Sequence, residues 1–286
     1  MATIDRIGKY QILATLGKGA HSTILHVRRA LDSREFALKV VAINGKEEMK
    51  FLEQARHEFR ISQLLGHPNL IKIYCLETEK DWLFRVRKVN MLIEYVNGKT
   101  LDQVPPLPMA KLVPLFAQVA SGLIHMHRRG VYHADMKPNN IILGKRGEVK
   151  IIDYGLSWIK GQTKDRIQGT PEYIAPETVR AKIVNERTDI FNFGATLYRM
   201  ATLKLPPSVA ASADTVKISE KTWKALFVPV QNLNRNVPES LCDLIHRCMS
   251  FNAEHRPQRM SEVYEALKGI AEEMGEAVEG GTDPGV

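Results

Sequence analysis

The segment 133–155 constrains this chain most, because it brings four costly polar side chains together between short apolar runs. Asp135, Lys137 and Asn140 lie close together in it, and Asp153 follows after the second apolar run. A polar turn would explain one such residue but not all four. Two carboxylates, an amide and an ammonium group are expensive to hold together inside a fold unless they meet charged ligands. Phosphate oxygens bridged by Mg²⁺ are such ligands. The segment therefore predicts a site for a metal-bound phosphate.

Composition places the chain among ordinary globular proteins. Its 286 residues are 44% hydrophobic and 25% charged, and this length allows two lobes. The three cysteines are Cys75, Cys242 and Cys248; their spacing fits neither a disulfide framework nor a zinc site. No signal peptide is evident, and the closest approach to a membrane span, 112–126, is interrupted by polar residues. We expect a soluble, cytoplasmic protein without a membrane span.

The positive charge is larger than the total suggests. Residues 272–286 carry five acidic side chains and no Lys or Arg, so removing them from the formal charge of +8 leaves +13 on the rest. A basic body could attract nucleic acid. However, no basic run exceeds a pair and no recognition motif is evident. The favoured interpretation is a solvated basic surface that also attracts a nucleotide polyphosphate, with no nucleic-acid partner.

The order of predicted elements indicates an α+β protein. An antiparallel sheet with one helix comes first, and after Asn97-Gly98 the pattern becomes mainly helical. Strands are predicted at 10–16, 23–27, 35–41, 70–76 and 89–96, and helices at 46–65, 114–128 and repeatedly from 187 onward. We predict an N-terminal lobe at 1–96, a C-terminal lobe at 97–271 and an acidic, disordered tail at 272–286.

A glycine loop joins the first two predicted strands. Gly17 and Gly19 form a G-x-G pattern, which alone is weak evidence for any function. A dinucleotide-binding fold would need a helix directly after the glycines. The following residues, 23–27, are β-branched and strand-like. The loop is therefore expected to cap a hairpin and to donate backbone N–H groups to phosphates.

A second expected contact joins Lys39 in an apolar strand to Glu58 on the first helix. A strand lysine usually faces solvent. Glu58, however, lies on the inward line through Ala55, Ser62 and Leu65, with spacings of three and four residues. An inward carboxylate needs a cation, so we expect Lys39 to pair with Glu58 and to hold phosphates.

With these residues in view, the chain from about Tyr10 to Leu267 resembles the eukaryotic-type Ser/Thr protein kinases. The matching motifs follow one another in the family's order. They are the glycine loop 17–24, Ala37-Leu38-Lys39, Glu58, His133-Ala134-Asp135, Asp153-Tyr154-Gly155, the segment end 169–177, Asp189 and Arg256. The resemblance implies a bilobal kinase fold, ATP and Mg²⁺ as cofactors, and protein substrates with Ser or Thr acceptors.

The resemblance also implies roles for individual residues. Asp135 would accept or orient the proton of a substrate hydroxyl, and Lys137 would steady the γ-phosphate. Asn140 and Asp153 would hold Mg²⁺. Lys39, secured by Glu58, would position the α- and β-phosphates. The remaining nucleotide-binding positions are Gly17, Gly19, Ile24, Ala37, the backbone of Glu94 and Val96, and Ile142.

Four departures from the family pattern bear on regulation. Ala134 replaces the arginine that gathers a phosphorylated activation loop, which predicts activity without that phosphorylation. Ser22 replaces the third glycine, and Tyr154 replaces a phenylalanine and brings a hydroxyl that needs a partner. Ser62 is polar on the inner helix line, which suggests control of that helix by a regulatory partner.

Two other functions compete with this interpretation. A catalytically silent, nucleotide-binding pseudokinase scaffold would share the fold, but Lys39, Asp135, Asn140 and Asp153 are all present. A small-molecule phosphotransferase of related fold would generally lack the segment end Ala175-Pro176-Glu177.

Overall fold

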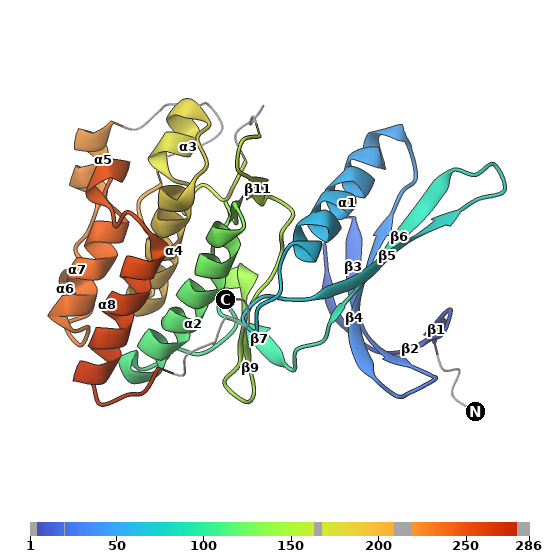
Figure 1. The fold of residues 1–286 in the computed structure, drawn as a ribbon, viewed down its shortest axis with the longest axis horizontal. Coiled ribbons are helices and arrows are strands. Elements are labelled where there is room, and N and C mark those ends of the chain that lie inside the picture. The colour runs from blue at the N-terminus through green and yellow to red at the C-terminus, as the bar shows by residue number, and fades with distance from the viewer. Residues whose placement is uncertain (1–4, 20, 163–167, 209–218, 279–286) are drawn as a thin grey trace. The chain divides into compact units, whose positions relative to one another are not determined.

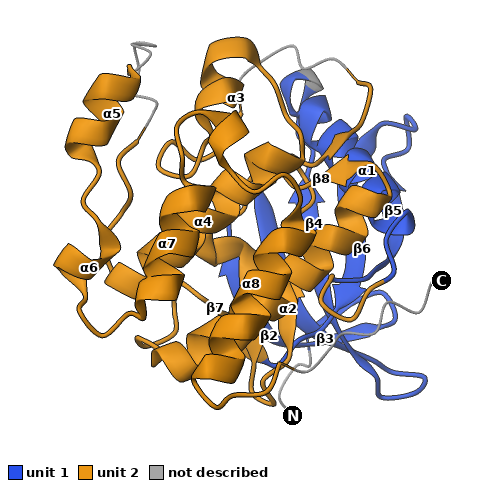
Figure 2. Ribbon diagram, turned by 60° about the vertical axis from the view of Figure 1, so that its left-hand side comes forward, with its two compact units in different colours: residues 1–66, 71–97 blue, residues 67–70, 98–286 orange. Residues whose placement is uncertain are grey.

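The computed structural model describes residues 5–19, 21–162, 168–208 and 219–278, which form two compact units. The N-terminal unit comprises 1–66 and 71–97, and the C-terminal unit comprises 67–70 and 98–286 (Figure 2).

The N-terminal unit is built on an antiparallel sheet of six strands in the order β1-β2-β3-β4-β6-β5 (Figure 1). The strands are β1 (Arg6–Ile7), β2 (Tyr10–Lys18), β3 (Ser22–Arg29), β4 (Glu35–Ala42), β5 (Ile73–Lys80) and β6 (Val86–Glu94). Alternation along β4 divides its side chains between two faces. Phe36 and Leu38 enter an apolar cluster with Val27 and Leu92. Lys39 lies on the opposite face, where it contacts α1 (Met49–Gln63).

The helix and two of the strands predicted in this unit have other bounds in the structure. The helix predicted from residue 46 begins as a 3₁₀ turn at Lys46–Glu48 before α1 starts at Met49. The strands predicted at 70–76 and 89–96 correspond to β5 and β6. The connection between them is shorter than predicted, because β5 ends at Lys80 and β6 begins at Val86. The reason is a turn without glycine, in which the Asp81 carboxylate accepts the backbone N–H groups of Leu83 and Arg85 at 2.9 and 3.0 Å.

The C-terminal unit is mainly helical. Its helices are α2 (Met109–Arg128), α3 (Pro176–Ala181), α4 (Glu186–Thr202), α5 (Glu220–Leu226), α6 (Val230–Leu233), α7 (Glu239–Cys248) and α8 (Met260–Glu273). Helix α2 begins five residues earlier than predicted, so Pro114 lies inside the helix rather than at its start. Among the described helices, α2 alone is long and apolar enough to cross a membrane, but 61% of that stretch is buried against this unit. Its apolar surface is that of a core helix packed against α8 and α4.

Short strands carry the polar cluster of the C-terminal unit. One sheet has the order β10-β9-β7, formed by β10 (Val149–Ile151), β9 (Ile141–Gly144) and β7 (Gly98–Thr100). A second pair joins β8 (Val131–Tyr132) to β11 (Trp158–Ile159). The two apolar runs noted in the sequence are β9 and β10, whose pairing of Ile141 with Ile151 brings Asn140 and Ile152 opposite each other.

The predicted tail at 272–286 overlaps the end of α8, which includes Glu272 and Glu273. Residues 279–286 lie outside the described residues.

Two glycines give opposite predictions for the same substitution. A Cβ on Gly194 of α4 would lie 2.6 Å from the Cβ of Cys248, whereas one on Gly269 of α8 would meet nothing within 4 Å. We expect Gly194→Ala to lower the free energy of unfolding by about 1–3 kcal/mol through overpacking. Gly269→Ala should raise it by roughly 0.5–1 kcal/mol, because alanine loses less backbone entropy in a helix. Urea unfolding followed by circular dichroism measures both, and equal shifts of the two midpoints would contradict the packing of α4 against α7.

Candidate active site

The polar cluster of the C-terminal unit converges on the carboxylate of Asp135, in the loop between β8 and β9. Lys137 Nζ donates to Oδ2 at 2.7 Å, and the Thr170 hydroxyl donates to Oδ1 at 3.0 Å. The backbone N–H of Thr170 also donates to Oδ1, at 3.1 Å. Lys137 reaches the Thr170 hydroxyl at 2.8 Å, which closes a triangle of three side chains. Asp135 is buried, and this triangle fixes the direction of its carboxylate.

Asn140 and Asp153 flank the β9–β10 hairpin. The Asn140 amide nitrogen donates to the Asp135 carbonyl at 2.8 Å and to its Oδ2 at 3.3 Å, which orients the amide. The carbonyl of Asn140 accepts from Ile152 N–H at 2.9 Å, next to Asp153. Asp153 is exposed and has a φ of 67°, and its Oδ1 accepts the Gly155 N–H at 3.1 Å.

An amide oxygen and a carboxylate suit Mg²⁺, which prefers oxygen ligands and takes its others from water and phosphate. No group of three or more His, Cys, Asp or Glu side chains able to hold a metal occurs in the described part of the chain. A metal held by Asn140 and Asp153 would thus depend on phosphate oxygens as well.

Asp189 on α4 accepts hydrogen bonds from the backbone of the loop that carries Asp135. Its Oδ2 accepts the His133 N–H and its Oδ1 accepts the Ala134 N–H, both at 2.8 Å. His127 Nε2 lies 2.7 Å from Oδ2, and His127 Nδ1 lies 3.3 Å from Glu186 Oε1, an ion-pair contact without hydrogen-bond geometry. Burial by itself would lower the pKa of His127, but its contacts with Asp189 and Glu186 outweigh burial and raise the pKa to about 9. A cationic His127 therefore neutralises the fully buried Asp189.

The segment end 169–177 is fixed by a buried ion pair. Arg256 donates to both carboxylate oxygens of Glu177, at 2.8 and 3.0 Å. The Arg256 side chain also donates to the carbonyls of Ser250, Phe251 and Arg187. The donors of the Arg256 guanidinium are thus satisfied. The bidentate pair connects Glu177 of α3 to Arg256, which lies just before α8.

In the N-terminal unit, the structure brings Lys39 and Glu58 together, with Lys39 Nζ 2.7 Å from Glu58 Oε2. Glu58 on α1 is buried, and the Lys39 side chain is 22% exposed. The pair links β4 to α1.

The glycine loop joins β2 to β3 by a tight connection, in which Gly19 N–H donates to the Ser22 carbonyl at 2.8 Å. A Cβ on Gly19 would lie 3.2 Å from the Ser22 hydroxyl, so the serine occupies space next to the loop backbone. Gly17 pairs with Ile24 across the hairpin, and Ile24 pairs with Lys39 on β4.

The remaining predicted nucleotide positions divide between the units. Ala37 is buried on β4, and Glu94 ends β6, followed by Val96. The Glu94 N–H donates to the Lys72 carbonyl at 2.8 Å, so it is not available to a ligand. Ile142, half-buried on β9 between Lys150 and Thr100, belongs to the C-terminal unit.

The unusual residues fit their surroundings in different ways. Ala134 has a φ of 64°, and its buried side chain is a methyl group with no charge to offer a phosphate. Tyr154 is fully buried, with its ring edge-on to His133. The Ser62 hydroxyl donates to the Phe59 carbonyl at 2.7 Å within α1, so its polarity is satisfied by the helix itself.

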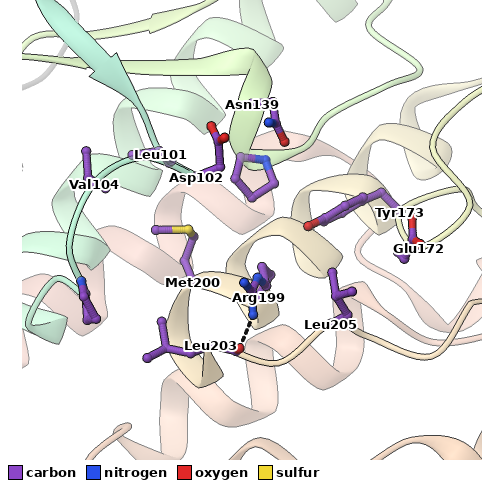
Figure 3. Close-up of a pocket in the computed structure, with 12 residues that line it drawn as sticks. Leu101, Asp102, Val104, Asn139, Glu172, Tyr173, Arg199, Met200, Leu203 and Leu205 are labelled. Carbon is purple, nitrogen blue, oxygen red and sulfur yellow. Dashed lines mark hydrogen bonds between the residues drawn. The ribbon is translucent and has the colours of Figure 1, made fainter.

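A cavity of about 380 Å³ lies beside the catalytic loop (Figure 3). Its wall combines Pro138 and Asn139 of the loop with Glu172 and Tyr173 of the segment end. On the helical side, the Arg199 guanidinium donates to the Leu203 carbonyl. The cavity is thus lined by both of the segments that the Asp135–Thr170 contact connects.

Sequence reasoning missed two residues of this network. No contact was predicted for Thr170, whose hydrogen bonds to Asp135 and Lys137 span more than thirty positions of sequence. His127 received no role; a histidine in the last turn of an apolar helix, shortly before Asp135, was the signal available.

Comparison with known proteins agrees with this geometry. Residues 10–267 match the family described as protein kinase domain. The chain is 29% identical over 272 residues to a protein named probable serine/threonine-protein kinase from Clostridium acetobutylicum, covering 92% of this chain and 40% of that one. It is 26% identical to serine/threonine-protein kinase PrkC of Bacillus subtilis, with 91% and 40% covered. It is 33% identical to CBL-interacting protein kinase 21 of Oryza sativa, with 70% and 39% covered. The chain thus spans less than half the length of these relatives.

The raised pKa of His127 predicts a pH dependence of stability. The folded state binds this proton more tightly than the unfolded state, whose pKa is about 6.5. The resulting stabilisation is complete below pH 6.5 and is lost as the pH rises through about 9. We expect the free energy of unfolding to fall by on the order of 3 kcal/mol across this range.

His127→Gln cannot titrate, so its unfolding free energy should be lower near pH 6 and nearly flat to pH 9. Urea titrations at several pH values test this. Parallel pH profiles for wild type and His127→Gln would rule out the His127–Asp189 charge pair.

Proposed function

Because the chain belongs to the protein kinase family, we propose that it transfers the γ-phosphate of ATP to Ser or Thr hydroxyls of protein substrates. The observation that carries this proposal is the triangle of Asp135, Lys137 and Thr170, which presents a carboxylate and an ammonium group side by side. The names of the relatives support the Ser/Thr class.

Asp135 would receive the acceptor hydroxyl. Its carboxylate is held by donors on both oxygens, so its direction is set before the substrate arrives. It would orient the hydroxyl toward the γ-phosphorus and take its proton as the new O–P bond forms, while the bond from the γ-phosphorus to the β,γ-bridging oxygen breaks and ADP leaves. Lys137, adjacent to it, places positive charge where the transferred phosphoryl group carries negative charge.

Asn140 and Asp153 would hold the magnesium. When bound, Mg²⁺ neutralises charge on the β- and γ-phosphates. The bonds from Asn140 to the Asp135 backbone keep the amide fixed in relation to the catalytic carboxylate. The Asp153 carboxylate remains exposed and available.

Lys39 would position the α- and β-phosphates. Glu58 holds the ammonium group, with Lys39 Nζ 2.7 Å from Glu58 Oε2. The loop 17–22 would cover the phosphates with backbone N–H groups.

A pseudokinase scaffold is the alternative. It is disfavoured by the completeness of the polar set, since Lys39–Glu58 is an ion pair and Asp135 is bonded to Lys137 and Asn140. The segment end Ala175-Pro176-Glu177, held by Arg256, favours proteins over small molecules as substrates.

Substitution of the proposed groups tests the function. We expect Asp135→Asn to lower kcat about 10²–10⁴-fold with little change in nucleotide KM, because it removes the proton acceptor. Lys39→Met should raise the nucleotide KM and lower kcat. Transfer of labelled γ-phosphate to a basic protein measures both, with the exposed Asp243→Asn as the matched control. Equal label in all variants, or label mainly on tyrosine, would contradict the proposal.

We further propose that activity does not require phosphorylation of the activation loop. Ala134 offers no cation to gather a phosphate. Its own backbone N–H donates to Asp189, and Thr170, at the described end of the activation loop, donates to Asp135. Regulation would then come from a partner protein. The three cysteines are free thiols, which is compatible with the expected reducing, cytoplasmic location.

Phosphatase treatment distinguishes this mode of control. Enzyme freed of phosphate should keep most of its turnover on an added substrate, because Ala134 cannot exploit the lost charge. Phosphate removal is verified by intact-mass measurement, and Ala134→Arg serves as the comparison. Loss of most turnover on dephosphorylation of the wild type would refute the proposal.

A further inference from the structure

The turn between β5 and β6 exposes three consecutive apolar side chains. Trp82 is 85% exposed, Leu83 43% and Phe84 82%. In the N-terminal unit, the pairing of β4 with β6 ends at Lys88. The tip of the β5–β6 hairpin extends beyond this point (Figure 1). Single exposed apolar residues are common, but a run of three large ones at one tip is costly unless something covers it.

The turn is built to hold these side chains outward. The Asp81 carboxylate accepts the N–H groups of Leu83 and Arg85 and the Arg87 guanidinium, all at 2.9–3.0 Å. Backbone bonds from Asp81 N–H to Arg85 and from Phe84 N–H to Asp81 close the loop at 2.9 and 3.0 Å. Phe84 adopts a φ of 60°, a left-handed conformation that a bulky residue rarely takes. The tip is therefore a braced turn and not a loose loop.

Basic side chains surround the tip. Lys80, Arg85, Arg87 and Lys88 lie within four residues of it and are all exposed. Arg87 pairs with Asp81 and Lys88 with Glu79. For Lys80 and Arg85, the described residues provide no ion-pair partner. The tip therefore combines the apolar side chains 82–84 with the positive charges of Lys80 and Arg85 next to them in the sequence.

We propose that this tip binds the surface of an anionic lipid bilayer, with Trp82 and Phe84 in the interface and Lys80 and Arg85 against the headgroups. Tryptophan favours the boundary between headgroups and acyl chains, where its ring is apolar and its N–H stays wet. Each basic residue near an anionic leaflet adds attraction that decays within a Debye length.

The shape of the tip favours lipid over a protein partner. A protein would need a preformed concave pocket for two large rings that project from a narrow turn, whereas a fluid interface accommodates a convex point without one. The charge also matches: the exposed Lys80 and Arg85 flank the apolar run in the sequence, and anionic headgroups lie next to the acyl region. The proposal concerns peripheral binding and is independent of the kinase chemistry.

Sedimentation with phosphatidylcholine vesicles, with and without phosphatidylserine, tests the proposal on the full chain. We expect binding to vesicles that contain phosphatidylserine and little to phosphatidylcholine alone, with loss at high salt. Trp82→Ser/Phe84→Ser should weaken binding about tenfold or more. Leu31→Ser, which removes a side chain that is 92% exposed at another turn of the same sheet, should leave binding unchanged.

The charge contribution is tested separately. Lys80→Glu/Arg85→Glu should weaken binding about tenfold or more. Lys145→Glu/Arg146→Glu makes the same charge change in the β9–β10 turn and should have a much smaller effect. Circular dichroism and urea midpoints establish that all variants fold.

A spectroscopic measurement locates the tip. Lipids brominated in the acyl chain should quench wild-type fluorescence more than that of Trp82→Phe, because Trp82 enters the interface. Absence of binding to phosphatidylserine vesicles, or equal binding by the tip and control variants, would overturn the proposal. Self-association that Trp82→Ser/Phe84→Ser abolishes, without vesicle binding, would overturn it in favour of a second copy.

Discussion

The buried carboxylate of Asp189 is the constraint on which the catalytic geometry depends. A fully buried charge is tolerated only when it is neutralised and hydrogen-bonded. Here the backbone N–H groups of His133 and Ala134 take one oxygen each, and His127 supplies the cation. Because the two amides must converge on one carboxylate, the backbone directly before Asp135 has little freedom, and the position of Asp135 follows from that of α4.

The same helix also holds the segment end 169–177. Asp189, Asn192 and Thr196 follow one another at spacings of three and four residues, so they lie on one face of α4. Asn192 donates to the Tyr173 carbonyl, and Thr196 donates to the Met136 carbonyl at 3.2 Å. One helix face thus holds both the catalytic loop and the segment end, and the Asp135–Thr170 contact joins two segments that share a support.

Sequence reasoning reached the parts of the site that lie close along the chain. Asp135, Lys137 and Asn140 fall within one short segment, and the inward line on α1 indicated Glu58 as the partner of Lys39 before any contact was known. Thr170 could not be assigned in this way, because its contact depends on how α4 positions the segment end. The hairpin β5–β6 was misplaced for a related reason, since a side-chain carboxylate, that of Asp81, replaces the usual turn glycine.

The loop around Ala134 is held in place without a charged side chain at this position. An arginine at this position would order the loop only through a phosphate that must first be added. Here the described segments are held by contacts within the chain: the Ala134 N–H donates to Asp189, Thr170 donates to Asp135, and Arg256 donates to Glu177. Each of these bonds forms on folding and needs no modification. These contacts are the reason for proposing that control of activity does not pass through Ala134.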